Sequence, residues 1–264
     1  MMKKVLFGVV SLAFLSGIVG CQKDNADVQE DKVPDAVISQ LRGMGFGTDN
    51  VQKTDGGFLV EGDIIVTPEM LAANGQHQKL RIAEVEQYRT FNLVTGLPRV
   101  IRIGTSGNIP AGLSTSINNA IARYNAEGLG ITMLRVTSSP NITIKVVNTG
   151  QYIASAGFPT GGNPYNTVNY AKKYTTGYSD GFMTTVLAHE IGHCIGFRHT
   201  DYMNRAYSCG SGGNEGQETT GVGAVLIPGT PSGPDAASWM LACLGAITNR
   251  PFNANDKVAL NYLY

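Results

Sequence analysis

Residues 189–199 read His-Glu-Ile-Gly-His-Cys-Ile-Gly-Phe-Arg-His, and this stretch constrains the fold more than any other part of the chain. His189 and His193 are four residues apart, so on an α-helix they lie on one face and can present two imidazole nitrogens to one metal ion. Gly196 can adopt the left-handed conformation that ends a helix. His199 follows closely enough to return as a third ligand. The sequence therefore predicts a helix that ends at Gly196 inside a metal site.

The number of ligands and one adjacent glutamate indicate a catalytic metal. Three histidines leave one tetrahedral position of Zn²⁺ open, which distinguishes catalytic from structural zinc. Glu190 is not needed as a ligand, so we expect it to act as the general base that takes a proton from an activated water. The five fixed positions would coincide by chance in roughly one chain in 10^5. The fourth histidine, His77, lies in a polar stretch where we expect it to be exposed.

The motif HExxHxxGxxH resembles that of the metzincins, and residues 189–193 spell the name of the bacterial dual-action HEIGH metallopeptidases. The resemblance covers residues 98–264. Ser238-Trp239-Met240 is similar to a Met-turn, in which the methionine packs beneath the zinc ligands, although an ordinary core methionine is the alternative. The resemblance implies an α+β, metzincin-like zincin domain with a mixed twisted sheet, an active-site helix and an irregular C-terminal subdomain. It also implies hydrolysis of a peptide or protein substrate.

Two positions depart from the related astacins. Ala242 stands where astacins have a tyrosine that can bind zinc, so no tyrosine switch is expected. Asp201 and Tyr202 follow the third histidine where astacins have a glutamate, and they are candidates for the cleft wall or for contacts behind the ligands. The resemblance further implies an edge strand that aligns the substrate backbone, which we expect within about residues 163–174.

The N-terminus has the features of an export signal. Two lysines precede a mainly apolar run over residues 5–19, which is short for a membrane-crossing helix. Residues 18–21, Ile-Val-Gly-Cys, resemble a bacterial lipobox, so residues 1–21 are expected to be a lipoprotein signal with Cys21 as the acylated residue. The predicted product is exported and held by its lipid at a membrane, as an outer-membrane or surface lipoprotein. An ordinary signal with a chance cysteine is the alternative.

Residues 22–90 are expected to form a polar tether and a small pro-like segment before the peptidase domain at 91–264. Asp35 is expected to cap a short helix that ends at Gly43, and residues 57–67 suggest extended chain interrupted at Gly62. Val60-Glu61-Gly62-Asp63-Ile64 resembles the FxGD stretch of astacin pro-segments, whose aspartate occupies the open zinc position. A plain turn at Gly62-Asp63 is the other interpretation, and both stay open.

Within the peptidase domain, apolar spacing predicts regular elements. Residues 100–103 suggest a strand, and apolar side chains at helical spacing over 113–124 suggest a helix that stops at Gly128. Two further strands are expected at 131–136 and 142–147, separated by a turn signal.

The mature chain has three cysteines after Cys21, so one must stay unpaired within the chain. Cys194 lies in the expected metal-binding helix and is interpreted as a small buried apolar residue. Cys209 is therefore paired with Cys243, which joins the loop after His199 to the segment after Met240.

Composition excludes some functions and leaves others open. The formal net charge is zero and no basic cluster is present, which argues against nucleic-acid binding. No calcium-loop motif is recognised. The favoured function is a zinc endopeptidase. A surface-anchored binding lipoprotein with the same fold but no turnover, and a zinc hydrolase acting on other substrates, are the alternatives. The sequence predicts neither the oligomeric state nor the cleavage specificity.

Overall fold

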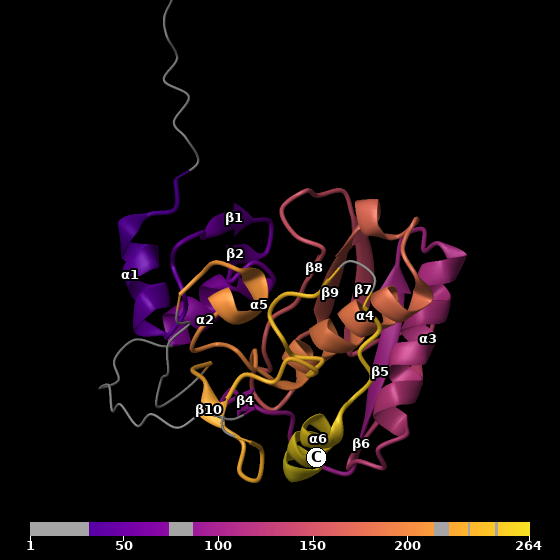
Figure 1. Ribbon diagram of the computed structural model, residues 1–264. Coiled ribbons are helices and arrows are strands. Elements are labelled where there is room, and N and C mark those ends of the chain that lie inside the picture. Colours follow the sequence, from indigo (N-terminus) through magenta and orange to yellow (C-terminus); the bar gives the residue numbers. More distant parts are fainter. Residues whose placement is uncertain (1–31, 74–86, 214–221, 232, 246–247) are drawn as a thin grey trace, which may run out of the picture. The chain divides into compact units, whose positions relative to one another are not determined.

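Figure 1 shows a computed structural model of the chain, which describes residues 32–73, 87–213, 222–231, 233–245 and 248–264. The signal sequence with Cys21, and the histidine at position 77, lie outside these residues. Among the helices in the described ranges, none combines the length and the apolar character needed to cross a membrane.

A five-stranded sheet organises the larger part of the chain (Figure 1). Its strands, in the order β6-β5-β7-β9-β8, are β6 (Ile131–Arg135), β5 (Arg99–Ser106), β7 (Ile142–Val147), β9 (Thr167–Ala171) and β8 (Ala154–Ser155). Neighbouring strands are parallel except β8, which pairs antiparallel with β9. Ile101 and Ile103 are buried while Val100 is exposed, the alternation of a sheet that is covered on one face. This mixed sheet with its helices confirms the α+β class.

Two long helices pack against each other and against this sheet. α3 (Ala111–Asn125) connects β5 to β6 and buries the predicted apolar stripe, including Leu113, Ile117 and Tyr124. α4 (Asp180–Ile195) is capped by Ser179, whose hydroxyl accepts the N–H of Phe182 at 3.1 Å, and it is buried over nearly its whole length. The remaining elements of this part are η1 (Lys172–Tyr174), α5 (Ala206–Cys209), α6 (Ala254–Leu263) and the antiparallel pair β4 (Tyr88–Arg89) with β10 (Val225–Leu226).

The N-terminal segment, residues 32–73, has its own small sheet and apolar cluster. Its elements are α1 (Asp35–Gly43), β1 (Gln52–Thr54), β2 (Gly57–Val60), β3 (Ile64–Val66) and α2 (Pro68–Ala73), and its strands form an antiparallel meander in chain order. The apolar residues of this segment pack together with Phe158 and Val222 of the larger part. The prediction that Asp35 caps α1 is wrong: Pro34 precedes the helix, no side chain caps it, and Asp35 is its first residue.

The expected position of the edge strand is also wrong. The strand found within residues 163–174 is β9, which is paired on both sides; the edge strand next to it is β8, and β6 forms the opposite edge. β8 has only two residues, so it carries no alternation that a sequence could reveal. The backbone beside it already has a partner, because the N–H of Ala156 donates to Asp63 O at 2.9 Å and its carbonyl accepts from the N–H of Ile65 at 2.6 Å.

Candidate metal centre

The end of α4 explains how three histidines can converge. Gly196 has φ 112°, in the left-handed region, and its N–H bonds to His193 O at 2.9 Å. A Cβ at this position would lie 2.8 Å from Asn92 O, so the neighbouring backbone also requires glycine. The helix therefore stops there, and the chain turns back towards its own last turn with His199.

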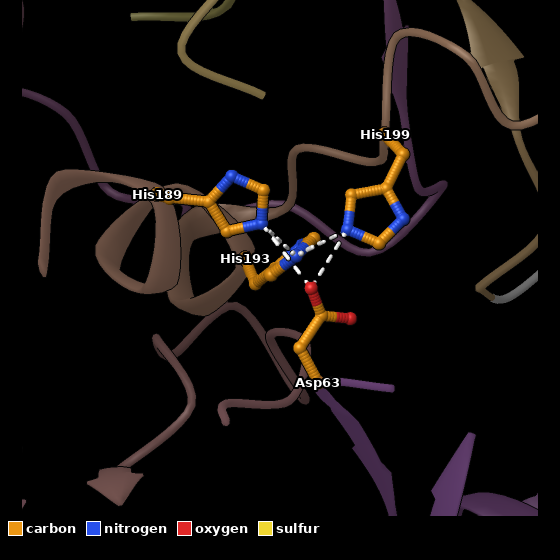
Figure 2. A group of neighbouring side chains, drawn as sticks. All are labelled: Asp63, His189, His193 and His199. Carbon is orange, nitrogen blue, oxygen red and sulfur yellow. Dashed lines mark hydrogen bonds and ion pairs between the residues drawn. The ribbon is translucent and has the colours of Figure 1, made fainter. Parts of the chain in front are cut away.

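The imidazole nitrogens of these histidines face one point, as Figure 2 shows. His193 Nε2 lies 3.0 Å from His189 Nε2 and 3.2 Å from His199 Nε2. All three side chains are buried, with at most 4% of any residue exposed. Nitrogens bound tetrahedrally to Zn²⁺ at 2.0–2.1 Å would be about 3.3 Å apart, so the observed spacing fits such an ion.

In two of the rings, the hydrogen bond made by Nδ1 determines whether Nε2 carries a proton. His189 Nδ1 lies 2.8 Å from the carbonyl oxygen of Trp239, and His193 Nδ1 lies 2.8 Å from that of Phe197. A carbonyl only accepts, so both Nδ1 atoms are assigned the proton and both Nε2 atoms present lone pairs. Burial and the neighbouring His189 and His199 lower the pKa of His193 well below its usual range. Neutral lone pairs packed this closely repel one another unless a cation lies between them, and the donor set fits zinc.

Asp63 lies at the same point, although it comes from the N-terminal segment (Figure 2). Its Oδ2 is 3.1 Å from His199 Nε2 and 3.5 Å from His189 Nε2. Asp63 and the three histidines are the one group of potential metal ligands found among the described residues. The residues Glu61–Asp63 form the turn between β2 and β3, so the turn and the approach to the histidines occur together in this structure.

The comparison with protein families agrees with this geometry. The family model described as dual-action HEIGH metallo-peptidase matches residues 58–264. This chain belongs to that family. The protein is thus a zinc metallopeptidase of the metzincin type, which confirms the resemblance drawn from the motif. The match begins ahead of Asp63, so the turn between β2 and β3 lies within the matched residues.

Two of the solved structures that match the chain are described next. Myroilysin is similar over 62% of this chain and 79% of its own, at 15% identity and a TM-score of 0.41. High choriolytic enzyme 1, a hatching-enzyme zinc-protease from the medaka fish Oryzias latipes, is similar over 62% of this chain and 88% of its own, at 17% identity and a TM-score of 0.40. No curated protein matches the sequence.

The pKa values of two carboxyl groups of this HEIGH metallo-peptidase are shifted in opposite directions. Burial raises the pKa of Glu190 well above its usual range, and the negative charge of Asp63 raises it further. Burial also acts to raise the pKa of Asp63, but the three neighbouring histidines, His199 foremost, outweigh it and lower that pKa well below its usual range. Within the described residues, Glu190 Oε2 is buried without a hydrogen-bond partner. It is therefore an available acceptor beside the ligands.

Met240 and Trp239 pack directly beneath α4. A Cβ at Gly192 would lie 2.6 Å from Met240 Sδ and 3.2 Å from Trp239 Nε1, so only glycine allows this contact. The carbonyl of Met240 accepts the N–H of Thr200 at 2.9 Å, which ties it to the residue after His199. The contribution of Gly192 and of the Trp239 carbonyl was missed by the sequence reasoning. The glycine inside the motif was visible, but its contact lies 48 residues away along the chain.

The loop after His199 is fastened to the segment after Met240. Asp201 is fully buried and accepts the N–H of Ala242 at 3.0 Å and the hydroxyl of Ser208 at 2.6 Å. Cys209 and Cys243 form a disulfide across the same two segments, and Cys194 is free and buried. Tyr202 is buried against Tyr88, with ring centroids 4.1 Å apart. It clusters with Tyr88 and Ala224 and does not line the cavity beside Glu190 that is described next.

A cavity of about 310 Å³ opens beside Glu190. Residues of α4, of the loop before β8 and of the segment after Met240 line it, including Val186, His189, Tyr152, Ile153, Leu241 and Leu244. Glu61 and Asp63 form part of the wall from the N-terminal segment. The HEIGH metallo-peptidase therefore retains an apolar space next to the metal ligands while Asp63 is in place.

Proposed function

We propose that the protein is an endopeptidase in which His189, His193 and His199 hold zinc and Glu190 is the general base. The observation that carries this proposal is the convergence of three Nε2 atoms, two of them assigned lone pairs, beside a buried glutamate whose Oε2 has no partner among the described residues. Bound zinc would supply Lewis-acid activation of a water and of the scissile carbonyl.

The side chains of this protein would perform the proton transfers and the orientation. Glu190 would take the proton of the attacking water and deliver it to the leaving nitrogen. The raised pKa of Glu190, caused by burial, suits a group that must hold that proton between the two steps. The carbonyl oxygens of Trp239 and Phe197 would keep two of the histidine rings oriented through both steps.

The test is Glu190→Ala, made in a chain that also carries Asp63→Ala. The second substitution removes the inhibition by Asp63 that is proposed below, which would otherwise mask activity. Peptide hydrolysis should fall at least about 100-fold, the usual contribution of a general base. Zinc content should stay at one ion per chain, because the residue is not a ligand. Near-normal turnover would contradict the assignment of the base. A binding lipoprotein without turnover, the alternative, would cleave no peptide library in either form.

We further propose that Asp63 is an inhibitory ligand and that residues 22–90 act as a pro-segment. Two contacts support this. Asp63 Oδ2 lies where the fourth ligand of a tetrahedral ion would be, 3.1 Å from His199 Nε2. The backbone of Asp63 and Ile65 pairs with Ala156 beside the sheet edge, where a substrate strand would bind by adding to the sheet. Activation would require a cut in the stretch between Ala72 and Arg89.

Asp63→Ala should raise peptide hydrolysis by the uncut chain more than tenfold, because a carboxylate would no longer compete for the open position. The matched control is Asp55→Ala, an exposed aspartate in the turn between β1 and β2. Equal activities of wild type and Asp63→Ala, with equal zinc content, would reject the inhibitory role.

We also propose export and acylation at Cys21, on the basis of the apolar run that ends at this residue. Mass spectrometry of the membrane fraction should find a mature N-terminus that begins with an acylated cysteine. Cys21→Ser should release the protein from membranes, and an unmodified N-terminus beyond residue 21 would reject the anchor.

A further inference from the structure

The turn that carries Asp63 carries a second acidic residue that points elsewhere. The carboxylate oxygens of Glu61 both lie 3.3 Å from Nη2 of Arg198, the residue before His199. The side chains are 1% and 0% exposed, so this is a fully buried ion pair. Removing one partner of such a pair strongly destabilises the arrangement that contains it, because the other charge stays buried without its counter-charge.

Further contacts hold both members of the pair in place. Arg198 Nη1 donates to Val222 O at 2.7 Å, and its guanidinium carbon lies 4.8 Å from the ring of Phe46 and 5.7 Å from that of Phe158. Glu61 Oε1 accepts the N–H of Gly47 at 3.0 Å. The arginine therefore contacts an acid and an aromatic ring of the N-terminal segment. It also contacts a carbonyl and an aromatic ring of the larger part of the chain.

The backbone of Glu61 is in an unusual conformation. Its φ is 55°, in the left-handed region that residues with a side chain rarely adopt. Gly62 follows with φ 92°, so the turn bends sharply over two residues. Such a conformation persists only where the surroundings determine it, and it clusters at sites with a function. Here the bend sends the side chains of Glu61 and Asp63 to two neighbouring residues, Arg198 and His199.

We propose that the Glu61–Arg198 pair is the latch that positions Asp63 on the metal ligands. The proposal rests on the inhibitory role of Asp63 proposed above. The backbone of Asp63 and Ile65 pairs with Ala156, and two side-chain points fix the turn beside it: the first is the ion pair with Arg198, and the second is the approach of Asp63 to His199. With the first point lost, the sharp bend at Glu61 is no longer held, and Asp63 leaves the histidines more often. Glu61 is thus a positioning residue for the block and takes no part in hydrolysis.

The test uses the full chain before any cut, with three variants assayed on one peptide substrate. Glu61→Gln keeps the shape and the bond from Gly47 but removes the charge, and it should raise hydrolysis about tenfold over wild type. Arg198→Lys keeps the charge but has only one nitrogen in place of the two that bond Glu61 and Val222 O, and it should give a smaller rise. Glu69→Gln, an exposed glutamate in α2, is the matched control and should match wild type within twofold.

A second measurement separates positioning from loss of structure. Cobalt replaces the metal in each chain, and its visible spectrum reports whether a carboxylate is bound. The spectrum of Glu61→Gln should shift towards that of Asp63→Ala. A chain that carries both Glu61→Gln and Asp63→Ala should be no more active than Asp63→Ala alone. If Asp63→Ala raises activity while Glu61→Gln and Arg198→Lys keep the activity and spectrum of wild type, the latch is wrong and the block stands. If Asp63→Ala, Glu61→Gln and Arg198→Lys all leave activity unchanged, the inhibitory role of Asp63 is wrong, and the latch is wrong with it.

Discussion

Two of the three histidine rings of the metal centre are oriented by main-chain carbonyls. His189 depends on the carbonyl of Trp239, and His193 depends on that of Phe197, each at 2.8 Å. A substitution at either carbonyl residue keeps the acceptor, so the orientation tolerates changes of residue type. It does not tolerate a displacement of the backbone, because the bond would lengthen and the ring would turn.

Gly192→Ala should displace that backbone. The new Cβ would meet Met240 Sδ at 2.6 Å and Trp239 Nε1 at 3.2 Å. Both side chains are fully buried and have little room to turn aside, so we expect their segment to move away from α4 with the Trp239 carbonyl. Zinc affinity should fall about 10- to 100-fold, the usual effect of losing a contact behind a ligand. Gly43→Ala, where an added Cβ meets nothing within 4 Å, is the control. Competition with a chelator measures the affinity, and an unchanged value would contradict the argument.

At this scale the convergence of the three histidines could be predicted, and the contacts that support their rings could not. The spacing of His189, His193 and His199 follows from helix geometry, so eleven consecutive residues contain the whole ligand set. The support for His189 is a carbonyl, which every residue has, and it lies 50 residues away in sequence. No residue type marks such a contact. Asp63 was predicted only as one of two readings, because a Gly-Asp turn occurs in many proteins without any metal.

Among the elements, the end of α4 determines the geometry of the site most directly. Gly196→Ala combines two costs, a left-handed φ and a Cβ 2.8 Å from Asn92 O, whereas Gly177→Ala has a left-handed φ of 80° with nothing within 4 Å. We expect Gly177→Ala to lower the free energy of unfolding by about 1 kcal/mol, and Gly196→Ala to lower it by at least twice that amount. Chemical denaturation of the zinc-loaded proteins measures both. Equal losses would mean that the contact with Asn92 relaxes freely.

Strands with a clear period were predictable, and their order in the sheet was not. The expected strands at 131–136 and 142–147 correspond to β6 and β7, but β5 lies between them, so the turn signal does not mark a hairpin. The helix expected at 113–124 is α3, which connects β5 to β6. The edge strand was misplaced because its neighbour β9 has the stronger pattern, and a pattern does not show how many partners a strand has.

On the scale of the whole molecule, one buried carboxyl group joins three distant stretches. Asp256 accepts the side-chain N–H of Gln87 at 2.5 Å and the N–H of Trp239 at 3.3 Å, and it forms the capping box of α6 with Asn253. Burial raises its pKa to about 6, against hydrogen bonds that act to lower it. The carboxyl group therefore binds its proton more tightly in the folded chain than in the unfolded one.

This shift predicts a direction for stability against pH. A raised pKa in the folded state contributes stability that is complete below pH about 4, and that contribution is lost as pH rises through about 6. The free energy of unfolding of wild type, measured relative to Asp256→Asn, should thus fall between pH 4 and pH 6. Taking the difference cancels the groups that both proteins share. A difference that rises over this range would show that the hydrogen bonds outweigh burial.

The free thiol in the last turn of α4 gives the metal centre a built-in chemical reporter. Cys194 is 0% exposed and directly follows His193, so a thiol reagent can reach it only when the zinc helix opens. Zinc binds the closed form, so each addition of metal makes opening rarer and each chelation makes it more frequent. In a Cys21→Ser chain with its disulfide intact, the rate of alkylation at Cys194 therefore measures how tightly the metal holds the fold closed, without any peptide being cleaved.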